Sequence, residues 1–375
     1  MPRRLFDGPL PQTPTGDPHN FGRRVALGPT GRIEKPRCVE WERLFLGDSS
    51  LRAELSRIFR ADNVPDPFEL FPTLSFRRGA EMVFSGDVDQ LAWSPGALLL
   101  TESACARIGA VIGLVSWFGM GDMHRQNIAF GTLGDGRPVC APVDIECLFF
   151  DYKLPAQSRL IGYPDEAGRR CGLAGFQELL DEAGRPAGFV AATLHGYIGV
   201  MLALTRHEHS VSSTLIAEPG ILGWPIRVIL RDTAAYRSVL DSVILPDTLR
   251  PGLLPSEMSQ LSRGDVPYFF REAASLEQRW LEKNSRDWTG ASAPVSPDPS
   301  EFPALEIIRE LGADGRIAWR HRETLLGAGT LQIARMLSGV GRGEASYAGA
   351  SLSVTDQHIA VSWGEDQRHR WACAR

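Results

Sequence analysis

The spacing of apolar residues predicts several helices. Apolar positions recur at helical spacing between residues 39 and 59, which predicts at least one helix there. Residues 98–119, LLLTESACARIGAVIGLVSWFG, carry few charges, so we expect a long helix buried at the centre of a larger lobe. Three further helices are predicted, over residues 176–184, 189–206 and 233–244.

Short strand signals lie between these helices. FGRRVAL (21–27) and RIEKPR (32–37) flank a GPTG turn, which predicts a hairpin with Lys35 on its second strand. IAFG (128–131) and PVDIECLFF (142–150) are separated by the turn TLGDGR, which predicts a second hairpin. Two further strand signals lie at 227–230 and 351–363.

Helices and strands mixed in this order predict an α+β fold. A chain of 375 residues is long enough for two or three packed lobes. We expect a small β-containing lobe over 1–97, a helical lobe over 98–285, and a linker with a C-terminal appendage over 286–375. The Ser- and Pro-rich stretch 285–303 predicts the linker.

Composition is typical of a water-soluble enzyme. Hydrophobic residues make up 43% and charged residues 23% of the chain, and the net charge is −5. The basic residues are scattered, so nucleic-acid binding gains no support. No secretory signal is recognisable, and the longest apolar run, 108–120, is shorter than the roughly 20 residues that a membrane span requires. These features predict a cytoplasmic protein without a membrane span.

The cysteines are single, with no CxxC pair. A structural zinc site or a disulfide framework is therefore not expected, and the thiols are predicted to be reduced and mostly buried. The six positions are Cys38, Cys105, Cys140, Cys147, Cys171 and Cys373.

Three polar residues around the second predicted hairpin suggest phosphoryl transfer. Asp122 and Asn127 lie five residues apart in one loop, and the hairpin would fold Asp144 back beside Asn127. Phosphoryl transfer from ATP needs a carboxylate near the attacking hydroxyl and an amide and a carboxylate on magnesium. In the alternative interpretation, Asp122 and Asn127 are turn residues and Asp144 is an edge-strand carboxylate. However, Asp144 precedes an apolar run, where a carboxylate needs a cation or a metal.

Lys35 is the matching candidate for a phosphate-binding lysine. A kinase-like fold places such a lysine on an early strand, ahead of the catalytic loop. No GxGxxG loop precedes Lys35, although Gly16 and Gly22 flank the segment DPHNF.

Four sequence blocks in order resemble the dehydratase domain of class II lanthipeptide synthetases. The blocks are GDPHNFGRRV with IEKPR, GDMHRQNIAFG with PVDIECLFF, IRVILRDTAAY, and GDVPYFF, which together span about residues 16 to 270. The resemblance implies a bilobal, lipid-kinase-like fold. It also implies an enzyme that phosphorylates Ser or Thr of a ribosomally made precursor peptide with ATP and Mg²⁺, and then eliminates phosphate to leave dehydroalanine or dehydrobutyrine.

The resemblance assigns roles to individual residues. Nucleotide binding would involve Lys35, Arg37, Asn127, Asp144 and Glu146, and magnesium would be held by Asn127 and Asp144. The catalytic loop would contain Asp122, His124 and Asn127. Phosphate elimination would use Asp17, His19, Arg227 and Thr233. Without the resemblance, His19 would be interpreted as a turn residue and Arg227 as a surface arginine on a strand. Tyr236 and Asp265 fall in matching blocks and are expected to be structural.

The sequence shows no counterpart of the family's zinc-bearing cyclase or of its large N-terminal segment. We therefore expect a stand-alone dehydratase that works on a precursor peptide, with a separate protein for leader binding or later modification. A kinase that keeps the phosphate on its product and a pseudokinase scaffold that presents a peptide are the alternatives.

Overall fold

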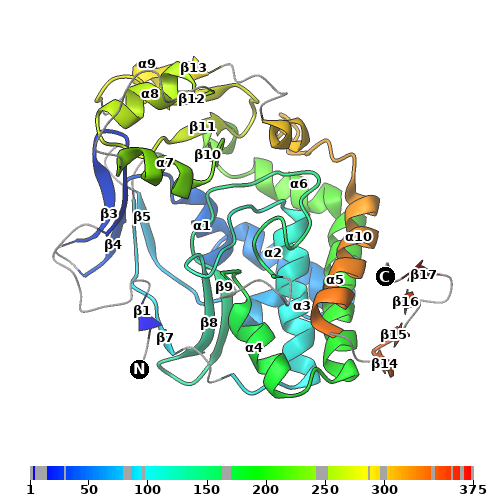
Figure 1. Ribbon diagram of the computed structural model, residues 1–375. Coiled ribbons are helices and arrows are strands. Elements are labelled where there is room, and N and C mark those ends of the chain that lie inside the picture. The colour runs from blue at the N-terminus through cyan, green and yellow to red at the C-terminus, as the bar shows by residue number, and fades with distance from the viewer. Residues whose placement is uncertain are drawn as a thin grey trace.

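The computed structural model describes a mixed α+β chain (Figure 1). The described residues are 3–4, 15–28, 31–78, 86–94, 98–162, 170–241, 252–285, 288–295, 302–338, 343–355, 358–363 and 367–372. The α+β class is therefore confirmed.

An antiparallel five-stranded sheet in the order β2-β3-β4-β6-β5 forms the N-terminal part. Its strands are β2 (Thr15–His19), β3 (Arg23–Leu27), β4 (Ile33–Lys35), β5 (Phe76–Arg78) and β6 (Gly86–Val88). The hairpin predicted around the GPTG turn is confirmed, since Ala26 pairs with Glu34 and Leu27 with Ile33. Two residues of that turn, 29 and 30, lie outside the described residues. Ile33 and Lys35 both point into the protein from β4.

Two helices occupy the region where the periodicity predicts at least one. They are α1 (Glu40–Leu46) and α2 (Ser50–Ala61). Gly47 leaves the helical conformation, and the Ser49 side chain then accepts the backbone N–H of Arg52 at 3.1 Å, which caps α2. A short 3₁₀ turn, Pro67–Leu70, follows. The helical conformation is therefore interrupted at Gly47, between α1 and α2, and the spacing of apolar residues does not predict this interruption.

A second antiparallel sheet has the order β1-β7-β8-β9. Its strands are β1 (Arg3–Arg4), β7 (Ala92–Ser94), β8 (Ile128–Leu133) and β9 (Pro138–Pro142). β8 and β9 form the second predicted hairpin, with Ile128 opposite Pro142. The strand ends at Pro142, so Asp144 lies just beyond the sheet rather than on its edge.

The main core is built around α3 (Glu102–Trp117), as the apolar stretch 98–119 predicts. α3 packs against α5 (Ala187–Arg206) so closely that two glycines are needed. A Cβ on Gly109 would lie 1.9 Å from the Thr193 carbonyl oxygen, and a Cβ on Gly196 would lie 1.8 Å from that of Ala106. Three more helices complete this part: α4 (Ala174–Glu182), α6 (Glu208–Ile216) and α10 (Arg322–Ser338).

A third sheet, in the order β10-β11-β12-β13, lies on the side of the molecule marked by α7 to α9 (Figure 1). Its strands are β10 (Pro225–Val228), β11 (Phe269–Glu272), β12 (Gln278–Leu281) and β13 (Ser292–Val295). The helices beside it are α7 (Thr233–Leu240), α8 (Pro255–Ser262) and α9 (Trp288–Ala291). The predicted linker is therefore wrong for residues 288–295: β13 pairs with β12, and Trp288 fills a buried apolar cluster. The rest of 286–301 lies outside the described residues.

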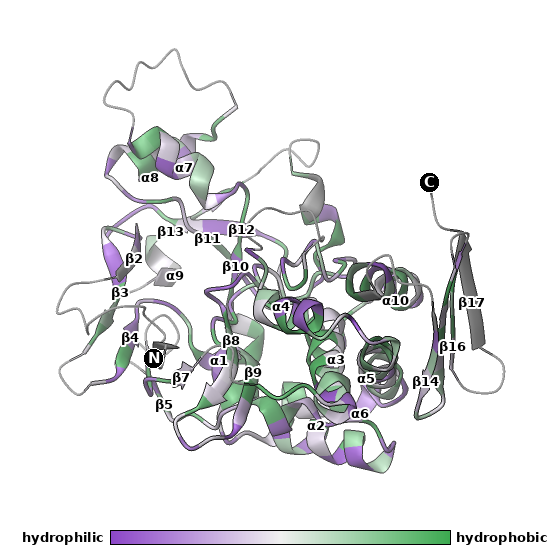
Figure 2. Cartoon of the chain, turned by 60° about the horizontal axis from the view of Figure 1, so that its bottom comes forward, coloured by the Kyte–Doolittle hydropathy of each residue, from purple (hydrophilic) through white to green (hydrophobic). Residues whose placement is uncertain are grey.

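A C-terminal antiparallel sheet forms a separate layer beside α5 and α10 (Figure 2). Its strands are β14 (Gly343–Tyr347), β15 (Ala350–Val354), β16 (His358–Trp363) and β17 (Gln367–Ala372). The predicted alternation over 351–363 is confirmed in β15 and β16, where Leu352, Ile359 and Val361 are buried. The predicted division into three parts remains a prediction.

Within the described residues, α5 alone is long and apolar enough to cross a membrane by length and composition, and 67% of its most apolar window is buried in the fold. The five described cysteines are buried thiols that form no disulfide among the described residues, while Cys373 lies outside these residues.

We expect Gly196→Ala to destabilise the fold by at least about 2 kcal/mol, because the new methyl group would collide with the α3 backbone. Gly327→Ala on α10 is the matched control: no atom lies within 4 Å of its Cβ position, so alanine should stabilise the helix by up to about 1 kcal/mol. Urea titration of both variants measures the free energies of unfolding. Equal effects would show that the α3–α5 contact can relax.

Candidate functional site

Lys35 reaches the site from the end of β4 as a buried ammonium group. Its Nζ donates to Glu42 Oε1 at 2.8 Å and to the Val143 carbonyl oxygen at 3.1 Å, and lies 3.7 Å from Asp144 Oδ1. Burial and the neighbouring Arg37 lower the pKa of Lys35 to about 8, against the opposing effect of Glu42. Lys35 is therefore a cation held ready beside the Asp144 carboxylate.

Arg37 joins the same cluster from the segment after β4. Its Nη2 donates to Glu42 Oε1 at 2.7 Å and is ion-paired with Asp144, and its Nε lies 3.3 Å from Glu146 Oε2. Burial alone would lower the pKa of Arg37, but Glu42 and Glu146 raise it above the usual value. One guanidinium thus joins three carboxylates.

Glu42 on α1 is a site residue that the sequence reasoning missed. Its carboxylate is 1% exposed and is shared by Lys35 and Arg37. A kinase-like fold pairs its phosphate-binding lysine with a helical glutamate in the same way. The available signal was a glutamate seven residues after Lys35, in a stretch whose neighbours Trp41, Leu44 and Phe45 are apolar.

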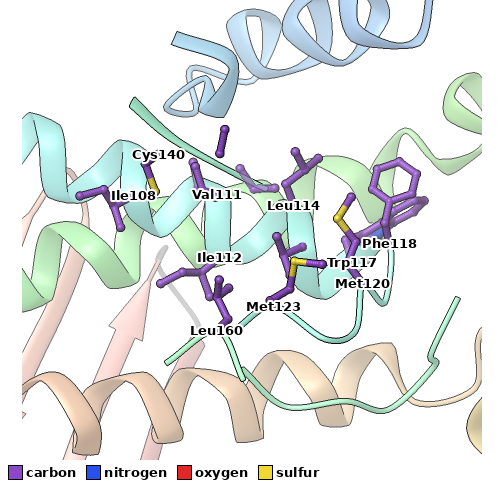
Figure 3. Packing of buried hydrophobic residues seen from close by; sticks show 14 of the residues in the cluster. Ile108, Val111, Ile112, Leu114, Trp117, Phe118, Met120, Met123, Cys140 and Leu160 are labelled. Atoms are coloured by element: carbon purple, nitrogen blue, oxygen red, sulfur yellow. The ribbon is translucent and has the colours of Figure 1, made fainter. Parts of the chain in front are cut away.

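The loop Asp122–Asn127 is held in place by Met123, a buried residue within it. Met123 is fully buried against α3, next to Leu160 and Ile112 (Figure 3), so Asp122 and His124 on either side of Met123 are left partly exposed. Asp122 has a φ of 59°, a left-handed conformation, and Asn127 Nδ2 donates to its carbonyl oxygen at 2.8 Å. The bond from the Asn127 side chain to the Asp122 backbone is also consistent with the alternative, in which both are turn residues.

Asn127 and Asp144 lie side by side, as the hairpin predicts. The backbone N–H of Val143 donates to the Asn127 carbonyl oxygen at 2.8 Å, directly after the β8–β9 ladder. The Asp144 side chain is 29% exposed and faces Arg37 and Lys35. Its place next to an apolar run is therefore explained by two cations.

These residues fit magnesium. Mg²⁺ is held in nucleotide sites by one or two oxygen ligands from the protein together with substrate phosphates. Asn127 uses its amide nitrogen in the bond to Asp122, which leaves its side-chain oxygen for a metal, and the Asp144 carboxylate is accessible. No group of three or more His, Cys, Asp or Glu with metal-site geometry occurs within the part of the chain that the structure describes, so a denser protein cage is not found there.

Glu146 connects this cluster with the residues assigned to elimination. It is buried and pairs with Arg227 on β10, while the backbone N–H of Arg227 donates to the Glu146 carbonyl oxygen at 2.7 Å. Burial alone would raise the pKa of Glu146, but Arg227 and Arg37 lower it to about 2. Arg227 is 13% exposed, so its interpretation as a surface arginine is wrong. The guanidinium also lies over the Tyr268 ring, 5.2 Å from its centroid.

His19 ends β2 beside this group. Its Nδ1 lies 2.7 Å from the Val266 carbonyl oxygen, and its ring centroid lies 5.5 Å from that of Tyr268. Burial, and after it Arg227, lowers the pKa of His19 to about 4, so the imidazole is neutral near pH 7. A neutral ring that donates from Nδ1 keeps Nε2 as an acceptor.

Asp17 and Thr233 meet the site through α7. Asp17 pairs with Arg237 of α7 at 2.6 Å, so it ties β2 to this helix rather than contacting His19. Thr233 is the first residue of α7, and Asp232 before it caps the helix by accepting the Ala234 N–H at 2.9 Å. Arg159 pairs with Asp232 and lies 4.0 Å from Asp122. All four residues that the resemblance assigns to elimination thus belong to elements that border the loop Asp122–Asn127 or Glu146.

Two residues of the matching blocks are structural, as expected. The buried Asp265 carboxylate accepts the backbone N–H groups of Phe21 and Gly22, each at 2.7 Å. The Tyr236 hydroxyl donates to Glu257 at 2.5 Å.

Comparison of the chain with protein-family models and with curated proteins finds no match.

We expect Glu42→Gln to cost about 3 kcal/mol of stability, because Lys35 and Arg37 would lose the charge that they share in a buried position. Glu69→Gln is the control, since the exposed Glu69 pairs with Arg107 at the surface and its loss should cost less than about 1 kcal/mol. Chemical denaturation separates the two outcomes, and similar losses would contradict the role given to Glu42.

We expect the His19 imidazole to stay neutral from pH 8 down to pH 5 and to titrate near pH 4. The unfolded chain binds this proton near pH 6.5, so it binds more protons than the folded chain between these values. Stability should therefore fall as the pH drops from about 6.5 towards 4, and His19→Gln should remove this part of the loss. Imidazole ¹⁵N shifts give the titration, and a midpoint near 6.5 would refute it.

Proposed function

We propose that the protein phosphorylates Ser or Thr of a precursor peptide with ATP and Mg²⁺ and then eliminates the phosphate, as a stand-alone dehydratase. One observation carries the proposal. Glu146 pairs with Arg37 of the lysine cluster and with Arg227 of the elimination group, so the residues suited to the two half-reactions share one buried ion-pair network. A simple kinase has no need of the second half.

In the first half-reaction, the substrate hydroxyl oxygen would attack the terminal phosphorus of ATP, and ADP would leave. Asp122, in its fixed loop, is the carboxylate placed to accept the hydroxyl proton. Lys35 and Arg37 would bind the nucleotide phosphates. Magnesium held by Asn127 and Asp144 would neutralise charge on those phosphates.

In the second half-reaction, the Cα proton is removed and the Cβ–O bond breaks. Phosphate departs, and a Cα=Cβ double bond forms. Arg227 and Thr233 would bind the leaving phosphate. Nε2 of neutral His19 is the candidate acceptor for the Cα proton. Burial lowers the pKa of His19, and the positive charge of Arg227 lowers it further. A phosphate dianion beside Arg227 would offset this second effect and make the imidazole a stronger base.

We propose that the chain also has a kinase-like bilobal architecture. The sheet β2-β3-β4-β6-β5 with α1 would be the small lobe of a kinase-like bilobal fold, and the helices around α3 and α5 would be the large lobe. The pairing of Lys35 on β4 with Glu42 on α1 supports this assignment. The proposed partner is a precursor peptide, whose leader would be bound by another protein. The proposed location is the cytoplasm.

The test uses intact-mass spectrometry of a Ser/Thr-containing precursor peptide encoded beside the gene, with ATP and Mg²⁺. We expect a loss of about 18 Da per site with wild-type protein, the mass of one water. Arg227→Gln should instead give gains of about 80 Da, because phosphate is added but not expelled. Asp144→Asn should leave the peptide unchanged, because the metal loses its carboxylate.

Control measurements distinguish the alternatives. Circular dichroism checks that both variants are folded, since Arg227→Gln leaves Glu146 with one cation fewer. Gains of 80 Da with wild-type protein would indicate a kinase that keeps the phosphate on the peptide. Absence of Mg–ATP binding by calorimetry would indicate a peptide-presenting scaffold.

A further inference from the structure

The segment 150–162 runs beside the catalytic loop and carries two cations that the assigned mechanism does not use. The backbone N–H of Met123 donates to the Ser158 carbonyl oxygen at 2.7 Å, which joins the segment to the loop. Leu160 is buried next to Met123 on the same face of α3 (Figure 3). Arg159 is therefore fixed from both sides, although its own side chain is half exposed.

Lys153 lies against the residue that precedes Asp122. Its Nζ is 3.9 Å from the centroid of the Phe150 ring, and a Cβ placed on Gly121 would be 3.1 Å from it. No carboxylate of a described residue lies within 4.0 Å of this ammonium group. The Lys153 side chain is half-buried against the Phe150 ring, so its ammonium group has less water around it than that of an exposed lysine. Such a cation is stabilised when an anion binds beside it.

Arg159 extends the same positive region towards α7. Its guanidinium pairs with Asp232 and lies 4.0 Å from Asp122, and its backbone has a φ of 63°. A left-handed conformation at a non-glycine residue costs free energy and is held here by the buried Leu160 and by the Gly172 N–H, which donates to the Arg159 carbonyl oxygen at 2.8 Å. The guanidinium thus lies between the catalytic loop and Thr233.

We propose that Lys153 and Arg159 form a binding site for the phosphoryl group once it is attached to the substrate side chain, so that the phosphorylated intermediate stays bound between the two half-reactions. This inference rests on the proposed function. A phosphomonoester carries about −1.5 to −2 charges near pH 7, and a lysine binds such a group as a point charge.

The neighbours of Lys153 favour the substrate phosphoryl group over the phosphates of ATP. The backbone N–H of Gly121, which lies against Lys153, donates to the Cys147 carbonyl oxygen at 3.0 Å. Cys147 directly follows Glu146, the partner of Arg227. Cys147 in turn lies within the field of Arg227. Lys153 therefore borders the elimination side of Asp122, where a phosphate would have to be expelled.

The experiment compares two probes on the full chain by isothermal titration calorimetry: N-acetyl-O-phosphoserine amide and Mg–ATP. We expect Lys153→Met to weaken binding of the phosphoserine probe at least about tenfold, since a charge-assisted contact to the phosphate is lost. Binding of Mg–ATP should change less than about twofold. Arg159→Gln should act in the same direction, and Lys153→Arg should restore part of the affinity.

Lys283→Met is the matched control, because Lys283 is exposed on the segment after β12 and belongs to no part of the site. It should leave both affinities unchanged. Unaltered phosphoserine binding in both Lys153→Met and Arg159→Gln, or no phosphoserine binding by wild-type protein, overturns the inference while leaving phosphorylation open. Equal losses for both probes also overturn it. Absence of Mg–ATP binding in wild-type protein would refute the proposed function instead.

Discussion

The site depends on the need to pair charges that the fold buries. Glu146 has almost no contact with solvent, yet it remains ionised because Arg37 and Arg227 lie on two sides of it. Arg37 follows the end of β4, and Arg227 lies on β10 of the third sheet, so one carboxylate holds together two parts of the chain that are distant in sequence. Removing either arginine leaves the buried Glu146 carboxylate with one cation instead of two, which weakens the compensation of its buried charge. The spatial relation of the two proposed half-reactions is therefore a condition of folding.

The sequence predicts the local elements of this arrangement well, because their signals are local. The two hairpins follow from turn residues, and the helix at α3 follows from a long apolar stretch. The neighbourhood of Asn127 and Asp144 follows from the second hairpin alone. These predictions require only residues that are close along the chain.

Other features depend on contacts between distant segments and have no comparable signal. Glu42 could not be recognised as the partner of Lys35 without knowing that α1 turns back over β4. Residues 288–295 look like a linker by composition. In the structure, however, β13 pairs with the edge of β12, and Trp288 packs into a buried apolar cluster. Lys153 and Arg159 lie in a segment without any motif, and the buried Met123 and Leu160 bring them to the loop Asp122–Asn127.

The shared carboxylate of Glu42 has a further consequence for ligand binding. Lysine and arginine side chains lose considerable rotational freedom when they are held in one position. At Lys35 and Arg37 that freedom is already lost in the structure without a nucleotide, since each side chain is hydrogen-bonded within a buried cluster. The entropic cost of ordering them thus falls on folding of the chain, and the proposed nucleotide would meet a rigid, pre-organised pair of cations.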